Sequence, residues 1–304
     1  MHAIRTPDDR FAHLPRFPFA PHYLEWNGLR VHYLDEGPAD GPVMLLVHGE
    51  PTWSYLYAGI IPALVAAGYR CIAPDHIGFG RSDKVVDDNW YVIERHCEVL
   101  RHVVDTLDLR HVTVVVQDWG GPIGLRQAVD QPDRFDRLVI LNTWLHHEGF
   151  EYSDGVRVWR MLAIDPDKLG GDMPTGRIVA GTLRRPGHDL DEVTAAYDAP
   201  YTGYDSKAGA RRFPWCIPFG EPEAGNAAQQ QRCYDALLAW PKPVHVIFGD
   251  ADPVFPAEWG RAWAERIPGA TFDIITGAGH FVQEDAPDDL VAAIVHRCGP
   301  AQQG

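Results

Sequence analysis

Two carboxylates and one imidazole follow strand-like segments in an order that could support hydrolysis through a covalent intermediate. Asp118 ends the apolar run HVTVVVQD, Asp252 follows KPVHVIFGD, and His280 ends TFDIITGAGH. In open α/β sheets, catalytic groups lie beyond the carboxyl ends of the strands, so these three side chains are expected to meet. A carboxylate can attack carbon, a histidine can then take a proton from water, and a second carboxylate can orient that histidine. The pattern predicts an enzyme with Asp118 as nucleophile, His280 as general base and Asp252 as the acid of a triad.

The segment around Asp118 is similar to the turn that presents a nucleophile between a strand and a helix. That turn has the pattern Gly-x-nucleophile-x-Gly, and here Gly120 provides the second glycine while Val116 replaces the first small residue. Gly121 and Gly124 still allow the following helix to pack closely on the sheet. A lone aspartate after a strand is usually a helix N-cap. The order nucleophile, acid, histidine, with each residue after a strand, favours the triad.

The surrounding sequence alternates between strand-like and helix-like segments. A hairpin is predicted over 22–35 around Asn27-Gly28. Further strands are expected at 43–49, 69–75, 111–118, 136–143, 242–250 and 271–280, and helices at 54–67, 90–109, 121–131, 257–267 and 286–297. Alternation of this kind predicts a mostly parallel sheet with crossover helices. Residues 145–230 interrupt it with many Pro, Gly, Trp and Tyr residues and no strand-like run, which predicts a mostly helical insertion over the carboxyl edge of the sheet.

Composition limits the classes of partner and compartment. The 304 residues carry a formal charge of −15, so nucleic acid and anionic membranes are not expected partners. The five cysteines are scattered without a paired motif, which argues against a disulfide framework or a zinc site. His146, His147 and Glu148 lack a third spaced ligand, so no metal and no cofactor are expected. With no apolar leader or membrane-length run, we expect a cytoplasmic protein, monomeric or weakly homo-oligomeric.

Five motifs together resemble one family. They are HGEPTWSYLY, PDHIGFGRSDK, VVVQDWGG, GDADPVFP and GAGHFVQE, and they are similar to those of haloalkane dehalogenases in the α/β-hydrolase superfamily. The resemblance runs from about residue 20 to 297 and is nearest to the branch whose triad acid follows the later strand, as Asp252 does. It implies the α/β-hydrolase fold, with a core domain of residues 1–144 and 231–304 and a helical cap of residues 145–230.

The resemblance also implies a reaction and the residues that serve it. The substrate would be a small halogenated aliphatic compound, converted to an alcohol, a halide ion and a proton. The backbone N–H groups of Glu50 and Trp119 would form the oxyanion hole. Trp119 and Trp159 would bind the halide through their indole N–H groups, with Trp144 and Trp215 as other candidates for the second position.

Further residues match positions around the family's substrate pocket. Glu50 matches a residue that positions the water and a halide-binding tryptophan. Pocket-lining positions are matched by Pro122, Val156, Phe213, Pro214 and Phe281. Pro122 and Val156 stand where well-known relatives carry aromatic residues, which implies a roomier or reshaped pocket.

Three other functions compete with dehalogenation. An epoxide hydrolase would use the same triad with two cap tyrosines, for which the candidates are Tyr152, Tyr197, Tyr201 and Tyr204. A fluoroacetate dehalogenase would need basic residues after the nucleophile, where this chain has Pro122 and Ile123. A non-catalytic ligand-binding protein of the same fold would be expected to lack a member of the triad.

Overall fold

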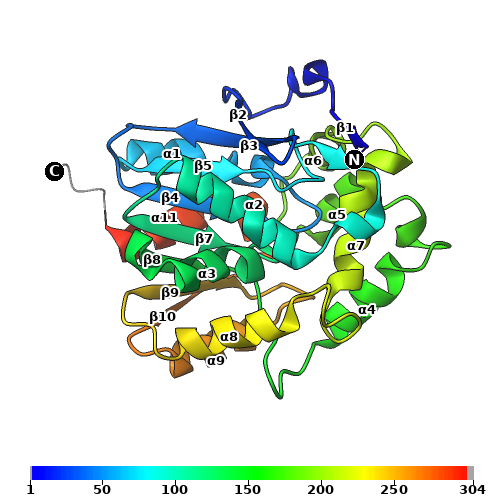
Figure 1. The fold of residues 1–304 in the computed structure, drawn as a ribbon. Coiled ribbons are helices and arrows are strands. Elements are labelled where there is room, and N and C mark those ends of the chain that lie inside the picture. Colours follow the sequence, from blue (N-terminus) through cyan, green and yellow to red (C-terminus); the bar gives the residue numbers. More distant parts are fainter. Residues whose placement is uncertain (1, 300–304) are drawn as a thin grey trace.

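The computed structural model describes residues 2–299 and is built on one eight-stranded sheet (Figure 1). The strand order is β10-β9-β8-β7-β4-β5-β3-β2. In chain order the strands are β2 (His22–Trp26), β3 (Leu29–Glu36), β4 (Val43–Val47), β5 (Arg70–Pro74), β7 (Val112–Val116), β8 (Phe135–Ile140), β9 (Val244–Gly249) and β10 (Thr271–Ile275). Strand β3 runs antiparallel to its neighbours β2 and β5, and the other pairs are parallel. The predicted mostly parallel α/β sheet is confirmed.

The residues of the central strands explain why they lie in the middle of the sheet. Every residue of β4, β7 and β9 is buried, which fits continuous apolar runs covered on both faces by helices. The edge hairpin β2–β3 turns at Asn27 and Gly28, whose φ angles are +50° and +78°. Two positive φ values are what a type I′ turn requires, so the predicted hairpin is confirmed. A separate pair, β1 (Ala3–Ile4) and β6 (Lys84–Val85), lies outside the main sheet.

Helices cover both faces of the sheet. In Figure 1, α2 (Ile93–Thr106) and α3 (Gly120–Asp130) lie in front of the strands, and α11 (Pro287–Cys298) lies behind them. The remaining core helices are α1 (Ile61–Ala66), α9 (Ala257–Arg266) and the short α10 (Val282–Asp285). The predicted single helix over 54–67 is wrong in its first half, where Ser54–Tyr57 form a 3₁₀ turn. Helix α1 begins only near Pro62, since proline fits the first turn of a helix but not its interior.

The chain between β8 and β9, all of which the structure describes, contains helices and no strand, as predicted. Its helices are α4 (Asp154–Ala163), α5 (Thr175–Thr182), α6 (Leu190–Asp198), α7 (Ala208–Arg212) and α8 (Ala227–Leu237). Figure 1 shows α4, α5 and α7 grouped at one end of the sheet. Helix α8 instead packs against α3, so the predicted boundary at residue 230 falls inside a helix that belongs with the sheet's covering layer. No helix within residues 2–299 has the length and apolarity needed to cross a membrane.

Candidate active site

The turn between β7 and α3 presents Asp118 in a strained conformation. Asp118 has φ = +51°, a left-handed value that non-glycine residues rarely adopt. Its backbone N–H donates to the Asn142 carbonyl at 2.8 Å, and its carbonyl accepts from the Thr143 hydroxyl at 2.5 Å. A Cβ atom at Gly121 would lie 2.0 Å from the same hydroxyl oxygen, so only glycine fits there. The structure thus contains the sharp turn that the sequence predicts for the nucleophile.

Val116 occupies the position where the turn motif has a small residue, and a later glycine makes room for it. A Cβ atom at Gly124 would lie 2.7 Å from Cγ1 of Val116. The valine side chain therefore fits because Gly124, one turn into α3, has no side chain. The departure from the motif does not prevent the turn from forming.

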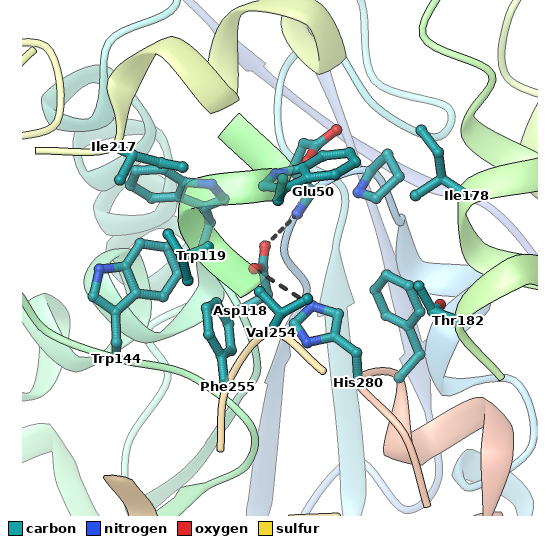
Figure 2. Close-up of a pocket in the computed structure, with 14 residues that line it drawn as sticks. Glu50, Asp118, Trp119, Trp144, Ile178, Thr182, Ile217, Val254, Phe255 and His280 are labelled. Carbon is teal, nitrogen blue, oxygen red and sulfur yellow. Dashed lines mark hydrogen bonds and ion pairs between the residues drawn. The ribbon is translucent and has the colours of Figure 1, made fainter. Parts of the chain in front are cut away.

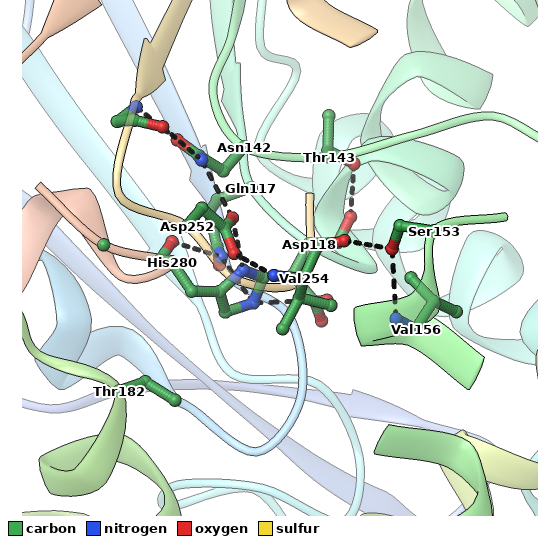
Figure 3. A network of polar contacts seen from close by, with 12 residues as sticks. Gln117, Asp118, Asn142, Thr143, Ser153, Val156, Thr182, Asp252, Val254 and His280 are labelled. Atoms are coloured by element: carbon green, nitrogen blue, oxygen red, sulfur yellow. Dashed lines mark hydrogen bonds and ion pairs between the residues drawn. The ribbon is translucent and has the colours of Figure 1, made fainter. Parts of the chain in front are cut away.

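His280 lies between the two aspartates that sequence order places in the triad. Its Nδ1 is 2.9 Å from Oδ2 of Asp252. Its Nε2 is 3.6 Å from Oδ2 of Asp118, and Figure 2 shows this second contact. Asp252 also accepts from the Val254 N–H at 2.7 Å and from the Asn142 side chain at 2.9 Å (Figure 3). Both oxygens of Asp252 thus accept from N–H groups, and in the triad arrangement the Nδ1–H of His280 donates to Oδ2.

The loop after β4 brings a backbone donor to the nucleophile. The Glu50 N–H donates to Oδ1 of Asp118 at 2.8 Å, and a Cβ atom at Gly49 would overlap that oxygen at 2.2 Å. Trp119 follows Asp118 as the N-cap of α3, where the first backbone N–H groups of a helix lack intrahelical acceptors. Oδ1 therefore points toward donors, and Oδ2 faces the imidazole.

Burial and the charge of Asp118 act in opposite directions on the pKa of His280 and in the same direction on the pKa of Glu50. Burial lowers the pKa of His280, but the charges of Asp252 and Asp118 outweigh it and raise the pKa to about 10. Burial raises the pKa of the Glu50 carboxyl well above its usual range, and the charge of Asp118 raises it further. Burial beside Asp118 therefore disfavours a second negative charge on this loop.

Asp118 and His280 line a partly enclosed, mostly apolar cavity of about 50 Å³ (Figure 2). Its walls are Glu50, Pro51, Asp118, Trp119, Trp144, Val156, Trp159, Ile178, Thr182, Ile217, Val254, Phe255, His280 and Phe281. The cavity excludes bulk water from the nucleophile, because Asp118 is only 6% exposed.

Three tryptophans line this cavity. Trp119 extends from the nucleophile turn and Trp159 from α4, the two positions predicted to bind halide. Trp144 packs edge-on against Trp119, with ring centroids 4.7 Å apart, and its ring nitrogen points away from Asp118 in Figure 2. Trp215, the other candidate, is 38% exposed and does not line the cavity.

Three residues predicted to line the pocket do not do so. Phe213 packs edge-on behind Trp119, with ring centroids 5.6 Å apart, and so supports the wall from outside. Pro214 is buried in the adjoining 3₁₀ turn, and Pro122 is buried in the first turn of α3. Of the five predicted lining residues, only Val156 and Phe281 reach the cavity.

The structure adds residues that the sequence does not single out. Asn142, which follows β8, donates from its side-chain amide to Asp252. Gln117 donates to His280, and Phe255 packs edge-on against the imidazole with centroids 4.9 Å apart. From the insertion come Ile178, Thr182 and Ile217. No pattern in the sequence distinguishes these three from ordinary packing residues of cap helices.

Comparison with known proteins identifies the fold and the family of this chain. Residues 42–163 match a family model described as the alpha/beta hydrolase fold. A haloalkane dehalogenase from Mycobacterium marinum is 42% identical over 97% of this chain and 99% of its own length. One from Psychrobacter cryohalolentis is 40% identical over 97% of each chain. The solved tetrameric haloalkane dehalogenase from Paraglaciecola agarilytica superposes with a TM-score of 0.88 at 34% identity, covering 98% of both chains.

Identity at this level extends over nearly the whole chain and includes the insertion between β8 and β9. The eight-stranded, mostly parallel sheet agrees with the structural match. The chain therefore belongs to the haloalkane dehalogenase family of the α/β-hydrolase fold.

Proposed function

We propose that this protein hydrolyses carbon–halogen bonds through an alkyl ester formed on Asp118. The observation that carries the proposal is that the two oxygens of this carboxylate have different neighbours. Oδ1 accepts from the Glu50 N–H at 2.8 Å, while Oδ2 lies 3.6 Å from Nε2 of His280 and is open to the cavity. One oxygen is held by a donor and the other is free to attack.

In the first step, Oδ2 of Asp118 forms a bond to the substrate carbon as the carbon–halogen bond breaks. The halide leaves with the bonding electrons and needs hydrogen-bond donors in a site without bulk water. An indole N–H group donates a hydrogen bond and cannot accept one. Trp119, next to the nucleophile, and Trp159, on α4, both line the cavity and suit this role. This step needs no proton transfer.

In the second step, His280 takes a proton from water as the water oxygen attacks the carboxyl carbon of Asp118. The negative charge that develops on Oδ1 is stabilised by the backbone N–H groups of Glu50 and Trp119. Collapse of the tetrahedral intermediate breaks the bond between the carboxyl carbon and Oδ2. The imidazolium of His280 gives its proton to the departing alkoxide, which leaves as the alcohol, and Asp118, now carrying the oxygen of the water, releases one proton to become a carboxylate again. Asp252 holds the imidazole in the required tautomer throughout.

The cavity supports short halogenated aliphatic compounds as substrates. Its volume of about 50 Å³ and its apolar walls suit few carbon atoms and no charged group. Opening the cavity for a longer chain would require the cap residues Val156, Ile178 and Ile217 to move.

Epoxide hydrolysis is the second candidate that the triad permits, but the cap tyrosines argue against it. None of Tyr152, Tyr197, Tyr201 and Tyr204, all within the described residues, lines the cavity. The Tyr197 hydroxyl donates to Glu284 at 3.1 Å, and Tyr204 is 55% exposed. None of these four tyrosines is thus positioned to protonate an epoxide oxygen held at Asp118.

One assay with two substrates separates the candidates. The protein is incubated with a short bromoalkane and with an aryl epoxide, while bromide and diol are measured. We expect bromide without diol, and no bromide from Asp118→Ala. Diol without bromide would overturn the proposal in favour of an epoxide hydrolase. Neither product, with ligand binding unchanged in Asp118→Ala, would show a non-catalytic binding protein.

A further inference from the structure

Gln117, the residue before the nucleophile, directs its side chain at the imidazole of His280 (Figure 3). Its Nε2 lies 3.2 Å from Nε2 of His280 and 3.1 Å from the backbone carbonyl oxygen of the same residue. The Gln117 side chain is completely buried. The same amide nitrogen therefore contacts the imidazole and the backbone that carries it.

The carbonyl contact fixes which way the Gln117 amide faces. A backbone carbonyl oxygen only accepts hydrogen bonds, so the amide atom beside it is the NH₂ group. Its second N–H then points at Nε2 of His280. Since Nδ1 of His280 already donates to Asp252, this N–H has an acceptor only when Nε2 carries no proton. Protonating Nε2 would bring two N–H donors to face each other at 3.2 Å.

The charged groups around the imidazole favour its protonation and so act against the effect of the Gln117 amide. Asp252 contacts Nδ1 from the loop after β9, and Asp118 faces Nε2 from the nucleophile turn. Both carboxylates favour the imidazolium, and burial raises the pKa of the third nearby carboxyl, that of Glu50 on the loop after β4. Once Asp118 is alkylated it loses its charge, and Gln117 then opposes Asp252 alone.

We propose that Gln117 is a positioning residue that keeps Nε2 of His280 unprotonated and aimed at the ester in the second step. The inference rests on the proposed function, because only the hydrolysis of the ester needs a free base. Gln117 itself makes no contact with the substrate. Its effect should appear in the pH dependence of ester hydrolysis and much less in the release of halide.

The test compares Gln117→Leu and Gln117→Glu with Gln127→Leu. Gln127 is a matched control, since it is also buried, donates from Nε2 to two carbonyl oxygens (of Cys97 and Ile123) and lies on α3 away from the imidazole. Rapid-quench measurements with a short bromoalkane give the bromide burst and the alcohol-forming step separately over pH 5–10. Melting curves establish that each variant is folded.

Loss of the N–H that favours the free base should raise the midpoint of the acidic limb of alcohol formation by roughly one pH unit in Gln117→Leu. Gln117→Glu, whose carboxylate would accept from the imidazolium, should raise it further, and the rate should recover at high pH. Gln127→Leu should leave the midpoint in place. An unmoved midpoint in both Gln117 variants, or the same movement in Gln127→Leu, would overturn the inference.

A second measurement does not depend on turnover. NMR titration of His280 in the free protein should give a higher pKa in Gln117→Leu than in the wild type. An equal or lower pKa would contradict the inference, even if the protein proved to have another activity. Absence of a covalent adduct in His280→Phe would instead refute the proposed function, so the two failures are distinguishable.

Discussion

Replacing Asp118 by asparagine should lower the pKa of His280 by about two pH units. The substitution keeps the shape of the side chain and removes one negative charge that lies 3.6 Å from Nε2 of His280. With an effective dielectric constant of about 20, unit charges at that distance attract by about 5 kcal/mol, equivalent to about three pH units. The carboxylate charge is shared with Oδ1, which points toward the Glu50 N–H, and this reduces the expected change to about two units.

This change matters because alkylation of Asp118 removes the same charge. In the free protein the two carboxylates raise the pKa of His280 to about 10, so the imidazole is protonated at neutral pH. In the ester only Asp252 remains, and the lower pKa frees the base when water must be activated. The side-chain amide of the Asp118→Asn variant thus serves as an uncharged stand-in for the ester.

The assay is NMR titration of ¹⁵N-labelled histidine in the wild type and in Asp118→Asn, with the His280 signal identified by its loss in His280→Phe. Intact mass verifies that the new amide persists. Asp130→Asn is a matched control, because Asp130 pairs with Arg126 on the surface of α3 and lies outside the cavity. A pKa that stays within half a unit of the wild-type value in Asp118→Asn would refute the electrostatic reasoning.

Three further outcomes are expected. Trp159→Phe should weaken the quenching of tryptophan fluorescence by bromide about tenfold, which is the effect of losing one charge-assisted hydrogen bond. The control Trp215→Phe, at an exposed tryptophan, should not weaken it. Equal quenching in both variants would exclude Trp159 as a halide ligand. The folded protein holds the His280 proton up to about pH 10, whereas the unfolded chain releases it near pH 6.5. The wild-type free energy of unfolding should therefore fall as the pH rises between these values, and it should fall less in His280→Phe. Parallel pH profiles of the two proteins in urea titrations would contradict this. Asp285→Ala should lower the free energy of unfolding, measured by urea titration, by about 3 kcal/mol or more. The reason is that this buried carboxylate accepts hydrogen bonds from the backbone N–H groups of Gly279, Arg184 and Arg185. A loss below about 1 kcal/mol would show that these bonds contribute little.

Much of the sheet and its order of catalytic residues could be predicted because these features depend on local sequence. Continuous apolar runs such as VMLLV and VTVVV predict buried parallel strands, and the residues after them necessarily lie at one edge of the sheet. This reasoning locates Asp118, Asp252 and His280, and the structure brings them together. The apolar spacing of 54–67 suits a 3₁₀ turn followed by a helix as well as one continuous helix, and Pro62 is the residue in the sequence that indicates where α1 begins.

The walls of the cavity could not be predicted, since they depend on how distant segments pack. Phe213 matches a lining position by sequence, yet its ring lies behind Trp119. Ile178 and Thr182 lie on α5, whose placement over the sheet depends on contacts that local sequence does not encode. Gln117 and Asn142 have roles that become visible only when their hydrogen-bond partners on other segments are known.

The most direct test of the account is the mass of His280→Phe after exposure to a short bromoalkane. This variant retains the nucleophile and the cavity but lacks the base for the second step. We expect one equivalent of bromide to be released and the protein to gain the mass of one alkyl group in place of a proton, on the peptide that contains Asp118. If the wild type turns over and the variant shows no adduct, or carries it on another residue, the account of Asp118 as the nucleophile is contradicted.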